Sequence, residues 1–237
     1  MGFRHRAPAK IYDVPSYHLL NVFTDESGAH GNPLGVFLDG GVVATDQRQR
    51  VAADLGYSET VFVDDAETGE LHIFTPASEL PLAGHPLVGS AWLIARENGS
   101  CEMIRPPAGE VPTWQDGELR WIRARPEWAP EMVLRRYDSP EEINGLDGAP
   151  DGLGFVDCWA WIDEAAGVLR SRVFVLEEGI PEDEATGAAA LRIGALLDRP
   201  LEIRQGVGSL LFARPGPDGT IDVGGRVLYR GEQAYGD

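Results

Sequence analysis

Two stretches of small residues, each beginning with a glycine-containing loop, constrain the fold of this chain more than any other feature. The first is AGHPLVGSAWLIA (83–95) and the second is ATGAAALRIGALL (185–197). In both, small and apolar residues occupy every side of the expected helix rather than one stripe. A helix of this kind has no face suited to water. The pattern therefore predicts two helices that are enclosed by the rest of the protein.

Strand-like segments surround both helices. They are rich in β-branched and aromatic residues and are separated by turn-forming residues. A short helix is also expected at 45–56, with Thr45 as its N-cap and Gly56 as its stop, and the first enclosed helix is expected from about 86 to 97, with Pro86 at its first position. The predicted strands are 16–24, 36–41, a hairpin within 59–76, 119–123, 131–136, a hairpin within 155–179, and three closing strands at 201–206, 209–215 and 220–232.

The order of these elements repeats. Strands, a small-residue helix and strands are followed by a second small-residue helix and more strands, which indicates a weak internal repeat. We therefore predict an α+β protein of two similar lobes, each a mixed, β-barrel-like sheet around a central helix. The predicted lobes are 12–105 and 106–237, after a disordered lead-in at 1–11, and the last strand is expected to cross to the first lobe.

Charge and cysteine content narrow the possible partners and location. The 237 residues carry a formal net charge of −18, which argues against nucleic acid and anionic membranes because both attract basic surfaces. Cys101 and Cys158 stand alone, without disulfide or metal spacing. The first residues lack the apolar core of a signal peptide, and no apolar run approaches the ~20 residues of a membrane span. A cytoplasmic protein is predicted.

The beginnings of the two small-residue helices are candidate ligand sites. Free N–H groups and the helix dipole favour an anion there, such as a substrate carboxylate. Three titratable residues lie beside these helix starts or just after a helix stop: Glu59, His85 and Asp183. Taken singly, each residue has a simpler explanation. Glu59 could be an exposed strand-edge residue, and His85 a core or capping histidine. Asp183 could be a charge that complements a helix dipole. Only their combination indicates acid–base chemistry.

Other chemical motifs are missing from the sequence. It contains no HExxH, GxSxG or Walker motif, and its five histidines are scattered, so no metal site is predicted. GVGSLL (206–211) lacks the third glycine of a dinucleotide-binding loop. Tryptophans gather at 114–128 and 159–161, where packing in a core or at a dimer interface explains them better than a platform for sugars or bases.

Four segments in fixed order resemble a known family. They are GNPLGVFLD (31–39), LGYSETVFV (55–63), IFTPASELPLAGHPLVG (73–89) and EDEATGAAA (182–190). Together they resemble the PhzF-like family, which is named for phenazine biosynthesis and is related in fold to diaminopimelate epimerase. The similarity extends from about residue 16 to 230. It is dense in the first half and confined to one motif in the second.

The resemblance implies both a fold and a chemistry. It implies two lobes with the active site between them, no cofactor and usually a homodimer. The family's reaction is isomerisation, in which a carbon-bound proton is removed from a small unsaturated acid and returned elsewhere. By position in the motifs, the catalytic residues would be Glu59, His85 and Asp183. Contacts to the substrate are expected from Asn32, Gly84, Gly187 and Ala188.

Several positions depart from the family pattern. Glu184 stands where the family usually has Pro, and Ala188 stands where it usually has Ser, so a substrate-binding hydroxyl is missing. The family's late Gly-Arg-Pro-Ser stretch is not visible in GVGSLLFARPG (206–216), and Asn21 replaces a common Asp. The chain is also short through 105–155. The acid–base residues thus remain while their surroundings differ, which favours the same reaction type on a different substrate.

We therefore predict a cofactor-independent isomerase of secondary metabolism or antibiotic biosynthesis that acts on a small unsaturated amino acid or related acid. Two alternatives stay open. An amino-acid epimerase or racemase is disfavoured because neither helix start carries the cysteine that the diaminopimelate relative uses. A protein that binds a small acid without turnover is favoured by Ala188 and the absent late motif.

Overall fold

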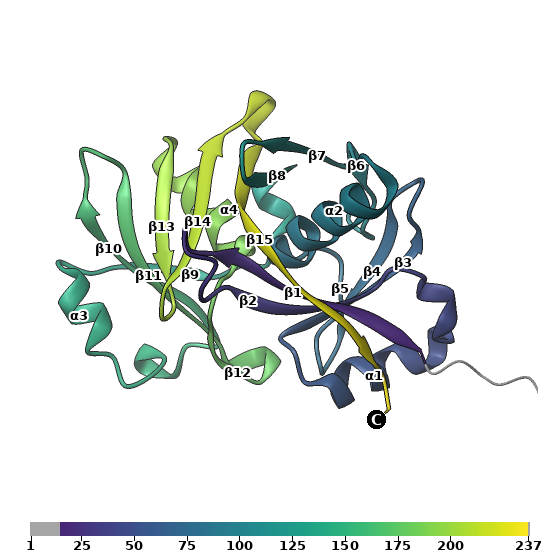
Figure 1. The fold of residues 1–237 in the computed structure, drawn as a ribbon. Helices are drawn as coiled ribbons and strands as arrows, with labels where there is room; N and C mark the ends of the chain where they lie inside the picture. The colour runs from purple at the N-terminus through teal and green to yellow at the C-terminus, as the bar shows by residue number, and fades with distance from the viewer. Residues whose placement is uncertain (1–14, 237) are drawn as a thin grey trace, which may run out of the picture.

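The computed structural model describes residues 15–236, so the expected lead-in at 1–11 lies outside the described residues. Within them a 15-stranded sheet runs in the order β5-β4-β3-β2-β1-β15-β14-β13-β11-β10-β9, with β6, β7, β8 and β12 attached beside this path. Figure 1 shows the two curved halves of this sheet, each facing a helix. The strands are β1 (Ser16–Thr24), β2 (Asn32–Phe37), β3 (Glu59–Asp65), β4 (Glu70–Phe74), β5 (Glu79–Leu80), β6 (Met103–Ile104), β7 (Val111–Asp116), β8 (Leu119–Ala124), β9 (Val133–Arg136), β10 (Phe155–Asp163), β11 (Val168–Val175), β12 (Ile180–Asp183), β13 (Leu201–Gln205), β14 (Ser209–Pro215) and β15 (Ile221–Ala234).

Helices are few, and two of them lie in the interior. The α-helices are α1 (Arg48–Leu55), α2 (Gly84–Asn98), α3 (Pro140–Asn144) and α4 (Gly187–Leu197). The short 3₁₀ helices are η1 (Gly40–Val42), η2 (Thr45–Gln47), η3 (Pro126–Trp128), η4 (Pro150–Gly152), η5 (Leu176–Glu178) and η6 (Pro217–Gly219).

The first half of the sheet encloses α2. This helix packs against β1, β2 and β3 on one side and against β6, β8 and β15 on the other. A parallel bridge between Glu70 and Arg105 joins the region of β6 to β4 and brings the two edges together. Leu87, Val88 and Ala91 of α2 are fully buried, because strands cover the helix on all sides. This is the environment that its small and apolar residues predicted.

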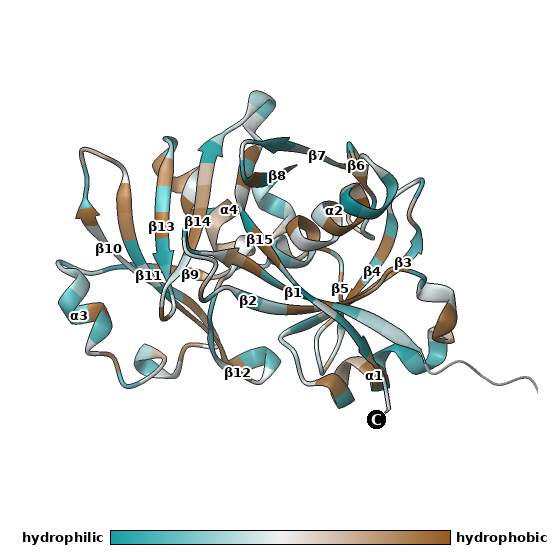
Figure 2. Ribbon diagram, in the orientation of Figure 1, coloured by the Kyte–Doolittle hydropathy of each residue, from teal (hydrophilic) through white to brown (hydrophobic). Residues whose placement is uncertain are grey.

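The second half of the sheet holds α4 in the same manner. The helix packs against β14, β15 and η3. Residues 187–194 of α4 are buried, with the exception of Arg192. Strands β10 and β11 carry apolar stretches, coloured brown in Figure 2, while hydrophilic residues mark many of the loops. Two enclosed helices within one continuous sheet confirm the predicted fold class.

Strand β15 belongs to both halves. Residues 221–225 pair with β14 and β8, whereas residues 226–234 pair with β1. Strands β6 and β8, which follow residue 102, pack against α2, the helix of the first half. The division of the chain into lobes after residue 105 stays a prediction.

Three local predictions need correction. Thr45 caps no α-helix: it begins η2, and α1 starts at Arg48 after Gln47, which makes no side-chain capping bond. Helix α2 starts at Gly84, so Pro86 is its third residue and not its first. Proline is tolerated there because the N–H groups of a first helical turn have no partner within the helix, so the N–H that proline lacks is not missed. Strand β2 begins at Asn32 instead of residue 36, because Leu34 and its neighbours pair with β1 and β3.

Candidate active site

Glu59 is the first residue of β3. The preceding helix α1 stops at Gly56, whose positive φ of 68° suits glycine and turns the chain into the strand. Glu59 then pairs with Leu34 of β2 and is only 8% exposed. Its Oε2 atom has no hydrogen-bond partner in residues 15–236. Burial, with a smaller contribution from the charge of Glu178, raises the pKa of this carboxyl to about 7.

His85 is the second residue of α2 and is 2% exposed. Its Nδ1 atom lies 3.5 Å from Oε2 of Glu59, and its Nε2 atom has no partner within the part of the chain described. Burial lowers the pKa of the imidazole to about 4. The ring is therefore neutral at pH 7, where it can accept a proton at one nitrogen and donate one from the other.

Asp183 ends β12 and is 5% exposed. Its carboxylate accepts a hydrogen bond from Asn32 Nδ2 at 2.7 Å and one from Thr186 Oγ1 at 2.5 Å. Burial raises its pKa to about 6, and the nearby charge of Glu59 acts in the same direction. Two carboxyls of raised pKa and one neutral imidazole thus occupy one buried site, a combination suited to general acid–base chemistry.

A polar layer holds Asp183 in place. Asn32 donates to Asp183 and also to the carbonyl of Ala185 at 3.2 Å, and its Oδ1 accepts from Ser58 Oγ. Gln205 Nε2 donates to the Asp183 carbonyl at 2.9 Å and to Thr186 Oγ1, and its Oε1 accepts from the Thr186 amide. No local motif marks Gln205, and only its place at the end of β13 brings it here.

Gly84 and Gly187, the first residues of α2 and α4, meet face to face. A Cβ atom on either glycine would come within 2.5 Å of the other's Cα, so no larger residue fits without parting the helices. Neither helix has a side-chain N-cap bond. The N–H groups of both first turns are therefore free of side-chain caps and meet at one place, an arrangement that favours an anion.

A cavity of about 320 Å³ opens beside these groups. Glu59, Asp183 and Ala188 line it, whereas His85, Asn32, Gly84 and Gly187 do not. His85 instead lies behind Glu59, and Asn32 behind Asp183. The full lining is Glu59, Thr75, Leu80, Leu82, Ala83, Pro130, Glu131, Phe155, Val175, Glu177, Glu178, Ile180, Asp183, Thr186 and Ala188.

Two of the departures from the family pattern are in contact with one another. Glu184, in place of the usual Pro, accepts hydrogen bonds from the amides of Val207 at 2.8 Å and Gly208 at 3.3 Å and from Ser209 Oγ at 2.7 Å. Ser209 Oγ in turn accepts from the Gly31 amide. The unusual GVGS turn between β13 and β14 is thus held by the unusual glutamate.

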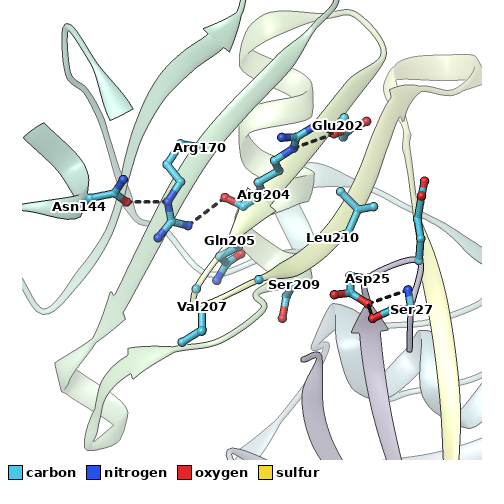
Figure 3. Close-up of a pocket in the computed structure, with 13 residues that line it drawn as sticks. Asp25, Ser27, Asn144, Arg170, Glu202, Arg204, Gln205, Val207, Ser209 and Leu210 are labelled. Atoms are coloured by element: carbon cyan, nitrogen blue, oxygen red, sulfur yellow. Dashed lines mark hydrogen bonds and ion pairs between the residues drawn. The ribbon is translucent and has the colours of Figure 1, made fainter. Parts of the chain in front are cut away.

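A larger hollow of about 700 Å³ lies on the outer side of that turn and is shown in Figure 3. None of the predicted site residues lines it. Its arginines are already engaged: Arg170 donates to Asn144 Oδ1 and to the Arg204 carbonyl, and Arg204 pairs with Glu202. We therefore place the candidate active site in the smaller cavity.

Fold and site together define a class. This is a two-lobed α+β protein in which buried carboxyls and two open helix starts surround one small cavity, an arrangement that can move a proton on a bound acid. The described residues contain no cluster of three or more His, Cys, Asp or Glu side chains able to hold a metal ion. Among residues 15–236, no helix has the length and apolar character needed to cross a bilayer.

Comparison with known proteins identifies the family. Residues 20–126 match the family described as phenazine biosynthesis-like protein. The trans-2,3-dihydro-3-hydroxyanthranilate isomerase of Pseudomonas chlororaphis is 30% identical over 91% of this chain and 95% of its own length. The enzyme of the same name from Pseudomonas fluorescens is 30% identical over 78% of this chain and 84% of its own. The chain belongs to the PhzF-like family of isomerases.

Solved structures agree on the fold. A putative phenazine biosynthesis PhzC/PhzF protein from Clostridium difficile superposes with a TM-score of 0.76 at 17% identity, covering 92% of this chain and 98% of that one. A hydroxyproline epimerase from Agrobacterium vitis superposes with a TM-score of 0.61 at 13% identity and covers 94% of both. The predicted family, its fold and its standing as an isomerase are confirmed. The roles of individual site residues stay predictions.

Proposed function

We propose that this protein shifts a double bond in a small unsaturated acid by moving one proton between two carbons, without a cofactor. One observation carries the proposal: two buried carboxyls, Glu59 and Asp183, line the same cavity beside two uncapped helix starts. The substrate carboxylate would lie at the starts of α2 and α4. The reacting carbons would then face Glu59.

Glu59 acts as the proton shuttle. Its ionised carboxylate takes a proton from a C–H bond, the electron pair moves through the neighbouring double bond, and the protonated carboxyl returns the proton at another carbon. No atom or electron is gained or lost overall. The removal step requires an extended unsaturated system that spreads the developing negative charge, and the open N–H groups of the helix starts would stabilise that charge.

His85 and Asp183 assist this step. The neutral His85 ring lies 3.5 Å from Oε2 of Glu59 and would hold that carboxylate in position. Asp183 lines the cavity and would position the substrate and assist proton delivery. Burial raises the pKa of Glu59 to about 7 and that of Asp183 to about 6, so both carboxyls can exchange protons near neutral pH.

The substrate would differ from that of the Pseudomonas enzymes, whose name gives trans-2,3-dihydro-3-hydroxyanthranilate. Ala188 lines the cavity and offers a methyl group where the family usually offers a hydroxyl. A substrate group that needed this hydroxyl would lose its partner. We infer the same reaction type on a related acid, within secondary metabolism or antibiotic biosynthesis.

Stereoinversion by paired thiols has no support from the site. The two cysteines of the chain, Cys101 and Cys158, are both buried and neither lines the cavity. The alternative of a protein that binds an acid without turnover depends mainly on Ala188, because neither Glu184 nor the altered late turn that it holds lines the cavity. Proton transfer by carboxyl groups therefore stays the favoured function.

The experiment is proton NMR in D₂O with small unsaturated amino and hydroxy acids. Wild type should introduce deuterium at one carbon and shift a double bond. Glu59→Gln should reduce turnover by about 10²–10⁴-fold, the usual contribution of general acid–base catalysis, while its chemical-shift dispersion and ligand line broadening remain. Glu164→Gln is the matched control, since Glu164 is exposed in the turn between β10 and β11.

The outcomes separate the alternatives. Normal turnover in Glu59→Gln would contradict its role. Deuterium at the α-carbon with loss of optical purity would establish the epimerase instead. Line broadening without any exchange would establish a binding protein.

We also propose a homodimer, as in the family, and a cytoplasmic location. Light scattering should give twice the monomer mass of 25.7 kDa. A single-chain mass at working concentration would contradict the dimer.

A further inference from the structure

We propose that a hollow at the far end of α2 is a second binding site, for a small carboxylic acid with an apolar body, and that Arg120 is the residue that holds its carboxylate. The hollow shares no lining residue with the candidate active site. The inference goes beyond the proposed function and does not depend on it.

The hollow has a volume of about 480 Å³ and is formed by the last turns of α2, strand β7 and Arg120 of β8, elements that can be followed in Figure 1. Helix α2 begins at the candidate active site and ends at this hollow. About 22 Å of helix therefore separates the two sites, at 1.5 Å for each residue of α2.

Arg120 is buried without a charged partner. It is 4% exposed, and both of its hydrogen bonds run from Nη2 to uncharged acceptors, the Cys101 carbonyl and Thr113 Oγ1. None of the ion pairs within residues 15–236 includes this arginine. A buried guanidinium without a counter-charge costs free energy, and the same burial lowers the pKa of Arg120.

The groups nearest to Arg120 do not supply the counter-charge. Burial raises the pKa of the Cys101 thiol, so this thiol is uncharged at pH 7. The end of α2 contributes a partial charge of roughly −0.5, which offsets only part of the charge of the guanidinium. A full negative charge beside Arg120 is still missing.

One nitrogen of the guanidinium is open to a ligand. Nε is sealed from solvent and has no partner in the described part of the chain. Nη1 makes no hydrogen bond there either, but it is not sealed, and Arg120 lines the hollow. Because buried polar groups are normally paired, a carboxylate at Nη1 would supply both the missing hydrogen bond and the missing counter-charge.

The other charged groups of the hollow are compatible with an anion. Arg96 also lines it, with its guanidinium 3.7 Å from the centre of the Tyr229 ring. Glu102 is the single acidic residue of the lining and is exposed, so water screens its charge. In a chain with a formal charge of −18, a local excess of positive charge of this kind is where an anion can bind.

Two apolar residues define the body of the ligand. Trp92 and Ala95 line the hollow, are half-buried and pack on the core of the first half. A ligand with an aromatic or branched carbon body would cover their remaining surface and gain affinity from its burial. A bare oxyanion has no such body and gains nothing from these two residues.

The test is NMR titration with three probes: benzoate, its neutral counterpart benzamide, and inorganic phosphate. Benzoate should shift the indole N–H signals of Trp92 and Trp114, which both line the hollow. We expect it to bind about tenfold more tightly than benzamide, equivalent to one charge-assisted contact of about 1.4 kcal/mol. Phosphate should bind more weakly than benzoate, because it covers no apolar surface.

Three variants locate the binding. Arg120→Gln should weaken benzoate binding at least tenfold. Arg125→Gln is the matched control, since Arg125 is exposed and lies outside the hollow, and it should leave the affinity unchanged. Ser100→Phe keeps the test decisive if Arg120→Gln does not fold: Ser100 is exposed at the hollow, and a phenyl ring there should also weaken benzoate binding at least tenfold with Arg120 in place.

Equal binding of benzoate and benzamide, tighter binding of phosphate, shifts confined to the candidate active site, or an unchanged benzoate affinity in a folded Arg120→Gln or Ser100→Phe variant would each overturn the proposal. A lower mass of Arg120→Gln than of wild type in light scattering would overturn it as well, because the counter-charge would then come from a second copy of the chain. The readout is binding at Trp92 and Trp114, so an absence of turnover leaves the result unaffected.

Discussion

At the scale of single residues, burial changes what Glu59, Asp183 and His85 can do. Each lies below one-tenth exposure, and desolvation is the largest cause of each shifted pKa. The neutral form is favoured in every case, so the two carboxyl pKa values rise and the imidazole pKa falls. Proton exchange between carboxyls is thereby moved toward neutral pH.

The pH dependence of turnover follows from these directions. Turnover requires ionised Glu59, whose pKa is about 7, and the proton that Glu59 takes up is the one that it returns, so no second acid is needed at high pH. We therefore expect kcat/KM to rise about tenfold per pH unit below pH 7 and to level off above it. His85, with a pKa of about 4, is neutral throughout.

The measurement is kcat/KM from pH 4.5 to 9 with the substrate found by NMR. Asp183→Asn should lower the plateau and keep the inflection near pH 7, because Glu59 is the group that titrates. A profile with a single inflection near pH 4 would assign the titration to the histidine and contradict this interpretation.

At the scale of elements, the contact between α2 and α4 leaves no room for a side chain. Gly187→Ala would place a methyl group 2.5 Å from the Cα of Gly84. Backbone cannot move aside as a flexible side chain does, so we expect a loss of about 3 kcal/mol in unfolding free energy, the upper end of overpacking costs. Parted helix starts would also lower substrate affinity.

Urea unfolding and NMR titration measure both effects. Gly148→Ala is the control, because a Cβ there meets nothing within 4 Å. An unchanged urea midpoint for Gly187→Ala would show that the two helix starts are less tightly apposed than described.

The turn between β13 and β14 depends on Glu184. Its carboxylate accepts two main-chain amides and one hydroxyl, and glutamine can offer only one of the two oxygens. We expect Glu184→Gln to lower the unfolding free energy by about 1–2 kcal/mol and to speed amide exchange at Val207 and Gly208. Glu202→Gln, which removes an exposed ion pair with Arg204, should cost less than about 1 kcal/mol. Equal effects of the two variants would contradict the role of Glu184.

At the scale of the whole molecule, β15 joins the two halves into one sheet. Ending the chain after Gly225 removes one of the two partners of β1 and leaves that strand as an open edge around α2. We expect this truncated chain to lose native chemical-shift dispersion and to aggregate. A chain that ends at Ala234 keeps the whole of β15 and should fold. Native dispersion in the shorter chain would show that the pairing of β15 with β1 is not needed for folding.

Local pattern predicted much of this architecture. Strand β1 matches the predicted range 16–24, and β14 matches 209–215, because runs of apolar and aromatic residues between turn-forming residues mark strands. The wrong predictions concern the ends of helices and strands. At a strand end, the neighbouring strand decides whether a residue joins the sheet. Residues from Asn32 onward form strand since β1 and β3 flank them, although Asn32 and Pro33 read locally as turn residues.

The candidate site was predictable only in part. The family motifs pointed to Glu59, His85 and Asp183, and the structure brings all three together. Gln205 and Glu178 carry no local signal, because each acts on residues far away in the chain: Gln205 lies 22 positions from Asp183, and Glu178 lies 103 from Thr75. Pairings of that kind arise only when the complete sheet closes.

The sequence by itself determined the two enclosed helices, the glycines at their starts and the strands around them, since these depend on the character of neighbouring residues. Only the tertiary structure decided the contact between Gly84 and Gly187, the shared role of β15 and the meeting of five acidic side chains at one cavity. It also decided the pKa values of the site, because desolvation depends on everything packed around a group, and no short stretch of sequence contains that information.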